Sequence, residues 1–129
     1  MPGLLPLPDS VDRPYWEAAR NGVLSLQKCG ACSHVLFPPG NRCPECGSRG
    51  LAWVKLSGRG TIWSWVVFHR KYFPEMPPPY TVLRVQLAEG PFLITNLVDD
   101  GGRIPAIGDS VRAVFQSFGE IALPQFTFD

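Results

Sequence analysis

The chain has 129 residues and a net charge of +1, enough length for one compact domain with a small attached module. Its composition, 45% apolar and 18% charged, is that of a soluble globular protein, and the weak charge argues against general binding to nucleic acid or membrane surfaces. The 14 prolines and 13 glycines favour short strands with frequent turns over a helical bundle.

The first eight residues are predicted to form an extended lead-in, because prolines interrupt this apolar segment. The segment has neither a basic n-region nor a continuous h-region, so we do not expect a secretory signal peptide. No stretch approaches the roughly 18 apolar residues that a membrane span needs. We therefore expect a cytoplasmic protein without a membrane association.

A short helix is predicted between Asp12 and Gly22. Asp12 can cap its start, Pro14 suits its first turn, and Asn21 with Gly22 can end it. A helix of this length is not stable alone and must pack on something. Its own domain is the favoured support, and a partner chain is the alternative.

The four cysteines of the chain form two C-x-x-C pairs, Cys29 with Cys32 and Cys43 with Cys46, separated by ten residues. This spacing is typical of a tetrahedral four-thiolate site, so we expect a structural zinc ion, with iron as a possible occupant. Two disulfides are the alternative, which a reducing compartment disfavours. With four thiolates available, His34 is not expected to be a ligand.

The segments around the cysteines have the layout of a zinc ribbon. Residues 23–28 are predicted to lead as a strand into the first cysteine turn, and residues 35–37 lead out of it. Residues 38–40 make the return, and residues 43–47 form the second turn. The predicted layout is therefore strand, cysteine turn, strand, cysteine turn.

From Leu51 onward the sequence has the character of strands, rich in β-branched and aromatic residues and divided by clear turns. No second helix is predicted, so five strands with one proline-rich loop at residues 70–79 suit an OB-fold barrel. We expect strands at residues 61–69, 80–87, 92–98, 110–116 and 121–128. The fold class is therefore mostly β, divided into an extension with a helix (1–22), a zinc ribbon (23–56) and a five-stranded OB-fold barrel (57–129).

The first barrel strand carries the aromatic residues that could serve a site. Simple alternation places Trp63 and Trp65 on one face together with Thr61, Val67 and His69. Filling of a core or an interface is the favoured role of the tryptophans, and a stacking platform is the alternative. His69 is expected to be a strand-end histidine, with a ligand-facing group at the barrel mouth as the alternative.

Together, the ordered motifs resemble the rubredoxin-like zinc ribbon plus OB-fold family that is catalogued as domain of unknown function 35. The resemblance covers roughly residues 14–128, nearly the whole chain. It is carried by residues 15–17, 24–29, 37–39, 43–47, 57–61, 79–80 and 123–126, in this order, with Cys32 in the first cysteine turn.

This resemblance implies a non-catalytic partner of acyl-CoA enzymes. Members commonly accompany thiolases or thiolase-like aldolases, and others are joined to hotdog-fold hydratases. Their barrel is proposed to bind or shield the acyl-CoA, while the ribbon and the N-terminal helix help to contact the partner. The family thus predicts a hetero-oligomer that is inactive without its partner.

Coenzyme A would need cations for its phosphates, and barrel strands or adjoining loops contain Arg59, Arg70, Lys71, Arg84 and Arg112. Arg70 and Lys71 are the strongest candidates because they begin the apolar, proline-rich loop of residues 70–79. Exposed apolar loops often contact partners or ligands, although a rigid cover over the barrel end is equally consistent with this sequence.

Two other functions fit parts of the sequence. A nucleic-acid module could combine a ribbon with an OB-fold, but it would need a basic groove with interleaved aromatic residues. A rubredoxin-type electron carrier could hold iron in the same four sulfurs, but it has no evident use for the barrel. Four thiolates also close the metal shell, which argues against a catalytic zinc. The accessory subunit is therefore the favoured function.

Overall fold

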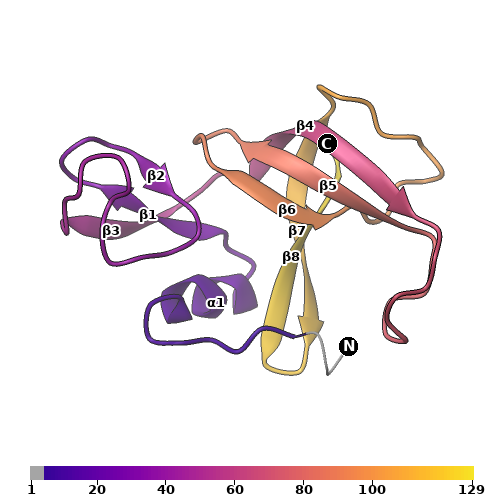
Figure 1. The fold of residues 1–129 in the computed structure, drawn as a ribbon, viewed down its shortest axis with the longest axis horizontal. Helices are drawn as coiled ribbons and strands as arrows, with labels where there is room; N and C mark the ends of the chain where they lie inside the picture. Colours follow the sequence, from indigo (N-terminus) through magenta and orange to yellow (C-terminus); the bar gives the residue numbers. More distant parts are fainter. Residues whose placement is uncertain (1–4) are drawn as a thin grey trace.

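The computed structural model describes residues 5–129, so the first four residues of the predicted lead-in lie outside it. Within this range the chain forms one helix and eight strands, arranged in a three-stranded sheet and a five-stranded sheet (Figure 1). This confirms the predicted fold class, a mostly β chain with a short helix, a ribbon and an OB-like barrel. Across residues 5–129, no helix is long and apolar enough to cross a membrane.

The helix α1 (Arg13–Arg20) begins one residue after the predicted cap. Asp12 is the N-cap residue, as predicted, but its side chain does not cap the helix, because its Oδ1 accepts the backbone N–H of Asp9 at 2.7 Å and makes no bond to α1. Tyr15 and Ala19 are buried where α1 packs against the ribbon and the last two strands. The favoured support for the helix, its own chain, is thus confirmed.

The ribbon sheet contains β1 (Ser25–Cys29), β2 (Val35–Leu36) and β3 (Leu51–Lys55) in the order β2-β1-β3. Both pairings are antiparallel, and β3 runs beside all of β1. The sheet lies on the left of Figure 1, and the barrel lies on the right. The predicted ribbon lacked its third strand, since the sequence does not distinguish β3 from the barrel strands that follow.

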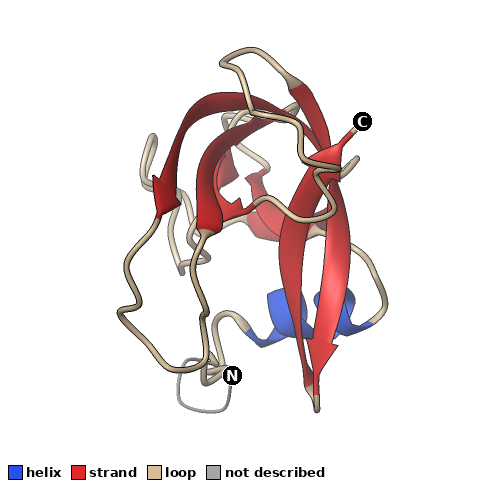
Figure 2. Cartoon of the chain, turned by 90° about the vertical axis from the view of Figure 1, so that its right-hand side faces the viewer, coloured by secondary structure: helices blue, strands red, loops and turns tan. Residues whose placement is uncertain are grey.

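The barrel is formed by β4 (Arg59–Phe68), β5 (Tyr80–Leu87), β6 (Phe92–Asn96), β7 (Ser110–Phe118) and β8 (Ile121–Phe128). The strands lie in the order β6-β5-β4-β7-β8, with antiparallel neighbours. A parallel bridge between Leu97 and Phe126 joins the two ends of this sheet, and Val98 N–H donates to the Phe126 carbonyl at 2.9 Å. β7 and β8 extend beyond the barrel as a two-stranded arm that lies beside α1 (Figure 2).

A β-bulge at Trp63 divides the first barrel strand into two parts of opposite phase. Ile62 pairs with Val85 and Trp65 pairs with Leu83, so both point into the core although three residues separate them. The predicted common face is therefore wrong: Trp63 is exposed on the outer face, and Trp65 packs against the core. The extra residue at the bulge reverses the alternation on which that prediction rested.

Gly60 of β4 pairs with Leu87 of β5 and has little space on its β5 side. A Cβ atom at this position would lie 2.5 Å from Cγ1 of Val85 and 2.8 Å from the carbonyl oxygen of Gln86. Val85 is itself fully buried. Position 60 therefore needs a glycine, because a larger residue has no space there.

Candidate functional site

The four cysteine sulfurs converge between the two turns of the ribbon. All four Sγ atoms lie within 4.8 Å of one another, with Cys29–Cys46 at 3.6 Å and Cys32–Cys43 at 3.5 Å. Cys29 and Cys43 are buried, while Cys32 and Cys46 are exposed. Each turn therefore contributes one inner and one outer sulfur to the cluster.

The two cysteine turns have matching backbone geometry. Ser33 N–H donates to the Cys29 carbonyl and Gly47 N–H donates to the Cys43 carbonyl, each at 2.9 Å. Both donors have left-handed backbone angles, with φ of 65° at Ser33 and 79° at Gly47. The fifth residue of each turn therefore reverses the chain, and both cysteines of the turn face the same point.

The thiol pKa values show how the sulfurs influence one another. The backbone amide of Cys32 is the main cause that lowers the pKa of the Cys29 thiol to about 6. For Cys32 the backbone amide of His34 acts in the same direction, but the Cys43 thiol and the other nearby sulfurs raise its pKa to about 12. Neighbouring thiolates repel one another, so the thiols do not all lose their protons easily. A divalent cation between them would offset this repulsion.

The donor set fits a zinc ion. A zinc–sulfur bond is about 2.3 Å long, so ideal tetrahedral ligands lie about 3.8 Å apart. Two of the sulfur–sulfur distances, 3.5 and 3.6 Å, are close to this separation, and all four sulfurs lie within 4.8 Å of one another. His34 lies outside the cluster, and its carbonyl accepts the Cys29 N–H at 2.8 Å. The four cysteines could therefore hold a structural metal ion without a further ligand.

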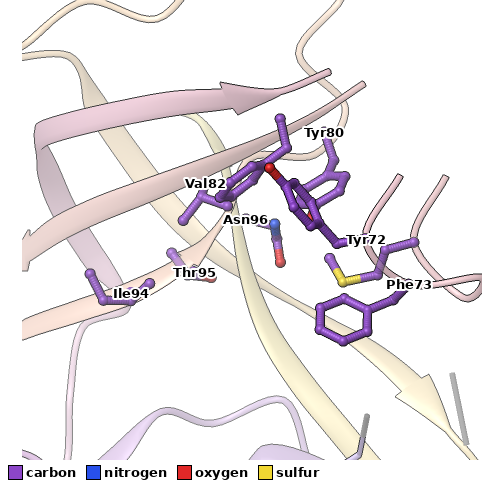
Figure 3. A pocket seen from close by; sticks show the side chains of 9 residues that line it. Tyr72, Phe73, Tyr80, Val82, Ile94, Thr95 and Asn96 are labelled. Atoms are coloured by element: carbon purple, nitrogen blue, oxygen red, sulfur yellow. The ribbon is translucent and has the colours of Figure 1, made fainter. Parts of the chain in front are cut away.

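A second candidate site is an apolar hollow of about 410 Å³ on the outside of the barrel. Its floor comes from β5 and β6, with Val82 and Ile94, and its wall comes from Tyr72 and Phe73 of the β4–β5 loop (Figure 3). Asn96 is a polar member, and its Nδ2 donates to the Thr81 carbonyl at 3.1 Å. The predicted apolar loop at residues 70–79 thus forms one wall of an open hollow.

A neighbouring hollow of about 300 Å³ lies where α1, the ribbon and the barrel meet. Trp16 of α1 and Phe37 of the ribbon form one side, and Pro124 of β8 forms another. Ile94, Thr95 and Asn96 line both hollows. β6 therefore separates two apolar depressions on the same side of the molecule.

The structure does not gather the predicted cations into one patch. Arg59 forms an ion pair with Asp129 and lies opposite Arg112 in the β4–β7 ladder. Arg84 lies on the outer face of β5, with its guanidinium carbon 4.0 Å from the centre of the Phe92 ring. The remaining two, Arg70 and Lys71, begin the β4–β5 loop and are exposed. The guanidinium carbon of Arg70 lies 5.7 Å from the ring centre of Tyr72, and Tyr72 lines the larger outer hollow.

His69 is exposed and directly follows the last residue of β4. With Trp65 and Val67 it lines a hollow of about 530 Å³ beside the loop at residues 100–105. Arg103 also lines this hollow, and its Nη2 forms an ion pair with Asp109 Oδ1 at 3.1 Å. His69 therefore lines an open hollow and is not part of the cysteine cluster.

Comparison with known proteins matches both halves of the chain. Residues 16–52 match the family described as the ChsH2 rubredoxin-like zinc ribbon domain, and residues 53–116 match the ChsH2 C-terminal OB-fold domain. A DUF35 domain-containing scaffold protein of Methanothermobacter thermautotrophicus is 37% identical over 100 residues, which cover 75% of this chain and 74% of that protein. The chain belongs to the DUF35 family.

A solved structure extends this similarity over nearly the whole chain. A chain of the structure described as an Ltp2-ChsH2(DUF35) aldolase has 34% sequence identity and a TM-score of 0.86. The match covers 96% of the present chain and 98% of that chain. The DUF35 fold is therefore shared from the helix to the last strand.

The family also occurs inside a longer protein. A probable enoyl-CoA hydratase alpha subunit of Thermomonospora curvata is 42% identical over 88 residues, or 67% of this chain. The matched region is only 28% of that subunit, so the present chain spans less than a third of its length. The similarity therefore concerns only that part of the longer protein.

The sequence prediction missed the apolar hollows and their shared residue, Ile94. In the sequence, Ile94 belongs to an apolar strand and resembles any core residue, yet it is 71% exposed. Only its pairing with Arg84 on the outer face shows that it points away from the core. No sequence signal separates it from Leu93, its buried neighbour.

Proposed function

We propose that this chain is a non-catalytic accessory subunit that binds a thiolase-like aldolase or a hydratase subunit of acyl-CoA metabolism. The observation that carries the proposal is the similarity, over almost all of both chains, to a chain of the Ltp2-ChsH2(DUF35) aldolase structure. The relatives named scaffold proteins and the hydratase alpha subunit support the same class of role. We expect a hetero-oligomer in which the catalytic residues belong to the partner.

A structural zinc ion held by Cys29, Cys32, Cys43 and Cys46 is part of this proposal. When bound, zinc supplies charge neutralisation and cross-linking of the two cysteine turns, and four thiolates leave no position open for a water molecule. Folding of the ribbon is thereby coupled to metal binding. The thiols must stay reduced for this role, which favours a cytoplasmic location.

We also propose Arg70 and Lys71 as contacts for the phosphates of acyl-CoA, next to the apolar hollow that Tyr72 lines. An open apolar hollow with Arg70 beside its Tyr72 wall suits a ligand with an apolar arm and an anionic end. The test is the affinity of the complex for coenzyme A after replacing Arg70 and Lys71 by alanine. Loss of affinity supports this contact, whereas unchanged affinity places the phosphates elsewhere.

The accessory role is tested by purifying the tagged chain from its native host and identifying the co-purifying proteins by mass spectrometry. The expected result is a thiolase-like aldolase or a hydratase subunit in fixed proportion to the chain, with about one zinc per chain. A chain that purifies alone, or with nucleic acid that salt removes, contradicts the proposal. Iron with a visible absorption band would instead indicate an electron carrier.

A further inference from the structure

The outer face of β4, β5 and β6 contains a row of apolar side chains. Val66 pairs with Val82, and both point outward, as does Ile94 on the next strand. The alternate residues, Leu83 and Leu93, point inward and are buried. The barrel core is therefore complete without the outward-facing row, and packing inside the chain does not explain its apolar character.

Ile94 is the centre of this row. It lines both outer hollows described above and a third one, of about 170 Å³, that also contains Val66 and Arg84. Val66 is 53% exposed and Ile94 is 71% exposed. The apolar surface thus continues from Tyr72 of the β4–β5 loop, across β6, to Phe37 of the ribbon. Contiguous apolar surfaces of this kind mark contacts with other proteins, with membranes or with ligands.

A positioned positive charge borders the apolar row. Arg84 lies directly opposite Ile94 in the β5–β6 ladder, and its guanidinium stacks on the Phe92 ring. Phe92 is in turn packed edge-on against Trp63, whose Nε1 donates to Gln86 Oε1 at 2.9 Å. The orientation of Arg84 is therefore fixed by aromatic packing rather than by a carboxylate.

The charge of Arg84 is not compensated within the described chain. Between residues 5 and 129, the ion pairs are Arg59 with Asp129 and Arg103 with Asp109, and neither involves Arg84. A cation held beside an apolar row is complementary to apolar side chains next to a carboxylate. This charge complementarity specifies the chemistry of the surface that would cover the row.

We propose that the outer face of β4–β6, centred on Ile94, is the docking surface for the catalytic subunit. That subunit presents an apolar patch to Val66, Val82 and Ile94, and an aspartate or glutamate to Arg84. This inference rests on the proposed accessory function and adds to it the location and the chemistry of the contact. The apolar contact supplies most of the affinity, and the ion pair sets orientation and salt dependence.

The probe for the test is the catalytic subunit that purification from the native host identifies, produced as a recombinant protein. Ile94→Asp is expected to weaken its binding at least about tenfold, because it places a charge in a buried apolar contact. Ile104→Asp is the matched control, since Ile104 is 76% exposed and lines none of the three hollows. The control is expected to bind like the wild type, and both variants should keep the wild-type circular dichroism.

The charge is tested separately with Arg84→Ala. This variant is expected to weaken binding by up to about fivefold at low salt and to reduce the salt dependence of the affinity. Arg112→Ala is its control, because Arg112 is an exposed arginine of β7 outside the three hollows. A photo-crosslinking residue at position 94 should join the two subunits, and the same residue at position 104 should not.

The outcomes separate the two proposals. If the wild-type chain retains no such catalytic subunit, the accessory function fails, and the docking surface fails with it. If the wild type binds the subunit and Ile94→Asp binds it equally well, the docking surface is wrong while the accessory function stands. If the chain alone forms a dimer that Ile94→Asp dissociates, a second copy covers this face, and the inference is likewise overturned.

Discussion

The side chain of Gln27 is bonded to both backbone groups of Gly40. Its Nε2 donates to the Gly40 carbonyl at 2.8 Å, and its Oε1 accepts the Gly40 N–H at 2.9 Å. Gln27 is buried in β1, whereas Gly40 belongs to the segment that connects the two cysteine turns. These two hydrogen bonds attach the connecting segment to the ribbon sheet, so that the second cysteine turn reaches the first.

Gln27→Ala is expected to destabilise the metal-bound chain by about 2 kcal/mol, since it removes two hydrogen bonds and leaves the partly buried N–H and carbonyl groups of Gly40 without these partners. The measurement is the free energy of unfolding in denaturant. Gln116→Ala is the control, because Gln116 is exposed in β7. Its free energy of unfolding is expected to change by no more than about 0.5 kcal/mol. Equal effects of the two substitutions would contradict the structural role of Gln27.

Removal of one inner cysteine is expected to abolish metal binding. Cys43→Ser should lower the zinc content from about one per chain toward zero, because three thiolates and a hydroxyl bind zinc weakly. His34→Ala should keep its zinc, since His34 lies outside the sulfur cluster. Elemental analysis of both purified variants makes this comparison. Zinc retained by Cys43→Ser, or lost from His34→Ala, would refute the assignment of the ligands.

Gly60→Ala is expected to destabilise the barrel by about 2 kcal/mol, because the new methyl group would overlap Val85 and the Gln86 carbonyl. Gly40→Ala is the matched control, as its nearest neighbour would lie 3.9 Å from the added Cβ atom. Thermal unfolding of the two variants distinguishes them. A Gly60→Ala chain as stable as the control would mean that β4 and β5 do not pack as closely as described.

The stability of the chain is expected to fall in strong alkali through Tyr15. Burial raises the pKa of its hydroxyl to about 12, above the ordinary value of 10.0. The unfolded chain therefore loses this proton first, so the contribution to stability is complete below pH 10 and disappears as the pH rises to about 12. Tyr15→Phe should flatten this part of the pH profile in denaturant titrations.

Tyr72→Phe is the control for the alkaline profile, because Tyr72 is exposed in the β4–β5 loop. It should retain the decline between pH 10 and 12 that Tyr15 causes in the wild type. If Tyr15→Phe declines as steeply as Tyr72→Phe, the buried hydroxyl is not the group responsible.

Much of this fold could be predicted because local patterns determine it. β5 and β8 occupy their predicted residues, since each is an apolar run between clear turns. The convergence of the cysteines follows from two short turns of matching length. The position of Trp63 could not be predicted, because a bulge depends on how β4 fits against β5 rather than on the residues of β4 alone.

The docking surface was also beyond sequence reasoning, for a related reason. Leu93 and Ile94 are neighbours with the same chemistry, and only the pairing of β6 with β5 decides that the first is buried and the second exposed. The hollows around Ile94 combine residues from the loop, α1, the ribbon and β8. Such a surface exists only after distant segments have been brought together.

The central claim, that this chain serves a catalytic partner, is tested most directly by native mass spectrometry of the complex purified from the host. We expect a defined hetero-oligomer that contains a thiolase-like aldolase or a hydratase subunit, in which each copy of this chain holds one zinc ion. A chain that remains free of any such subunit at every protein concentration tested would contradict it.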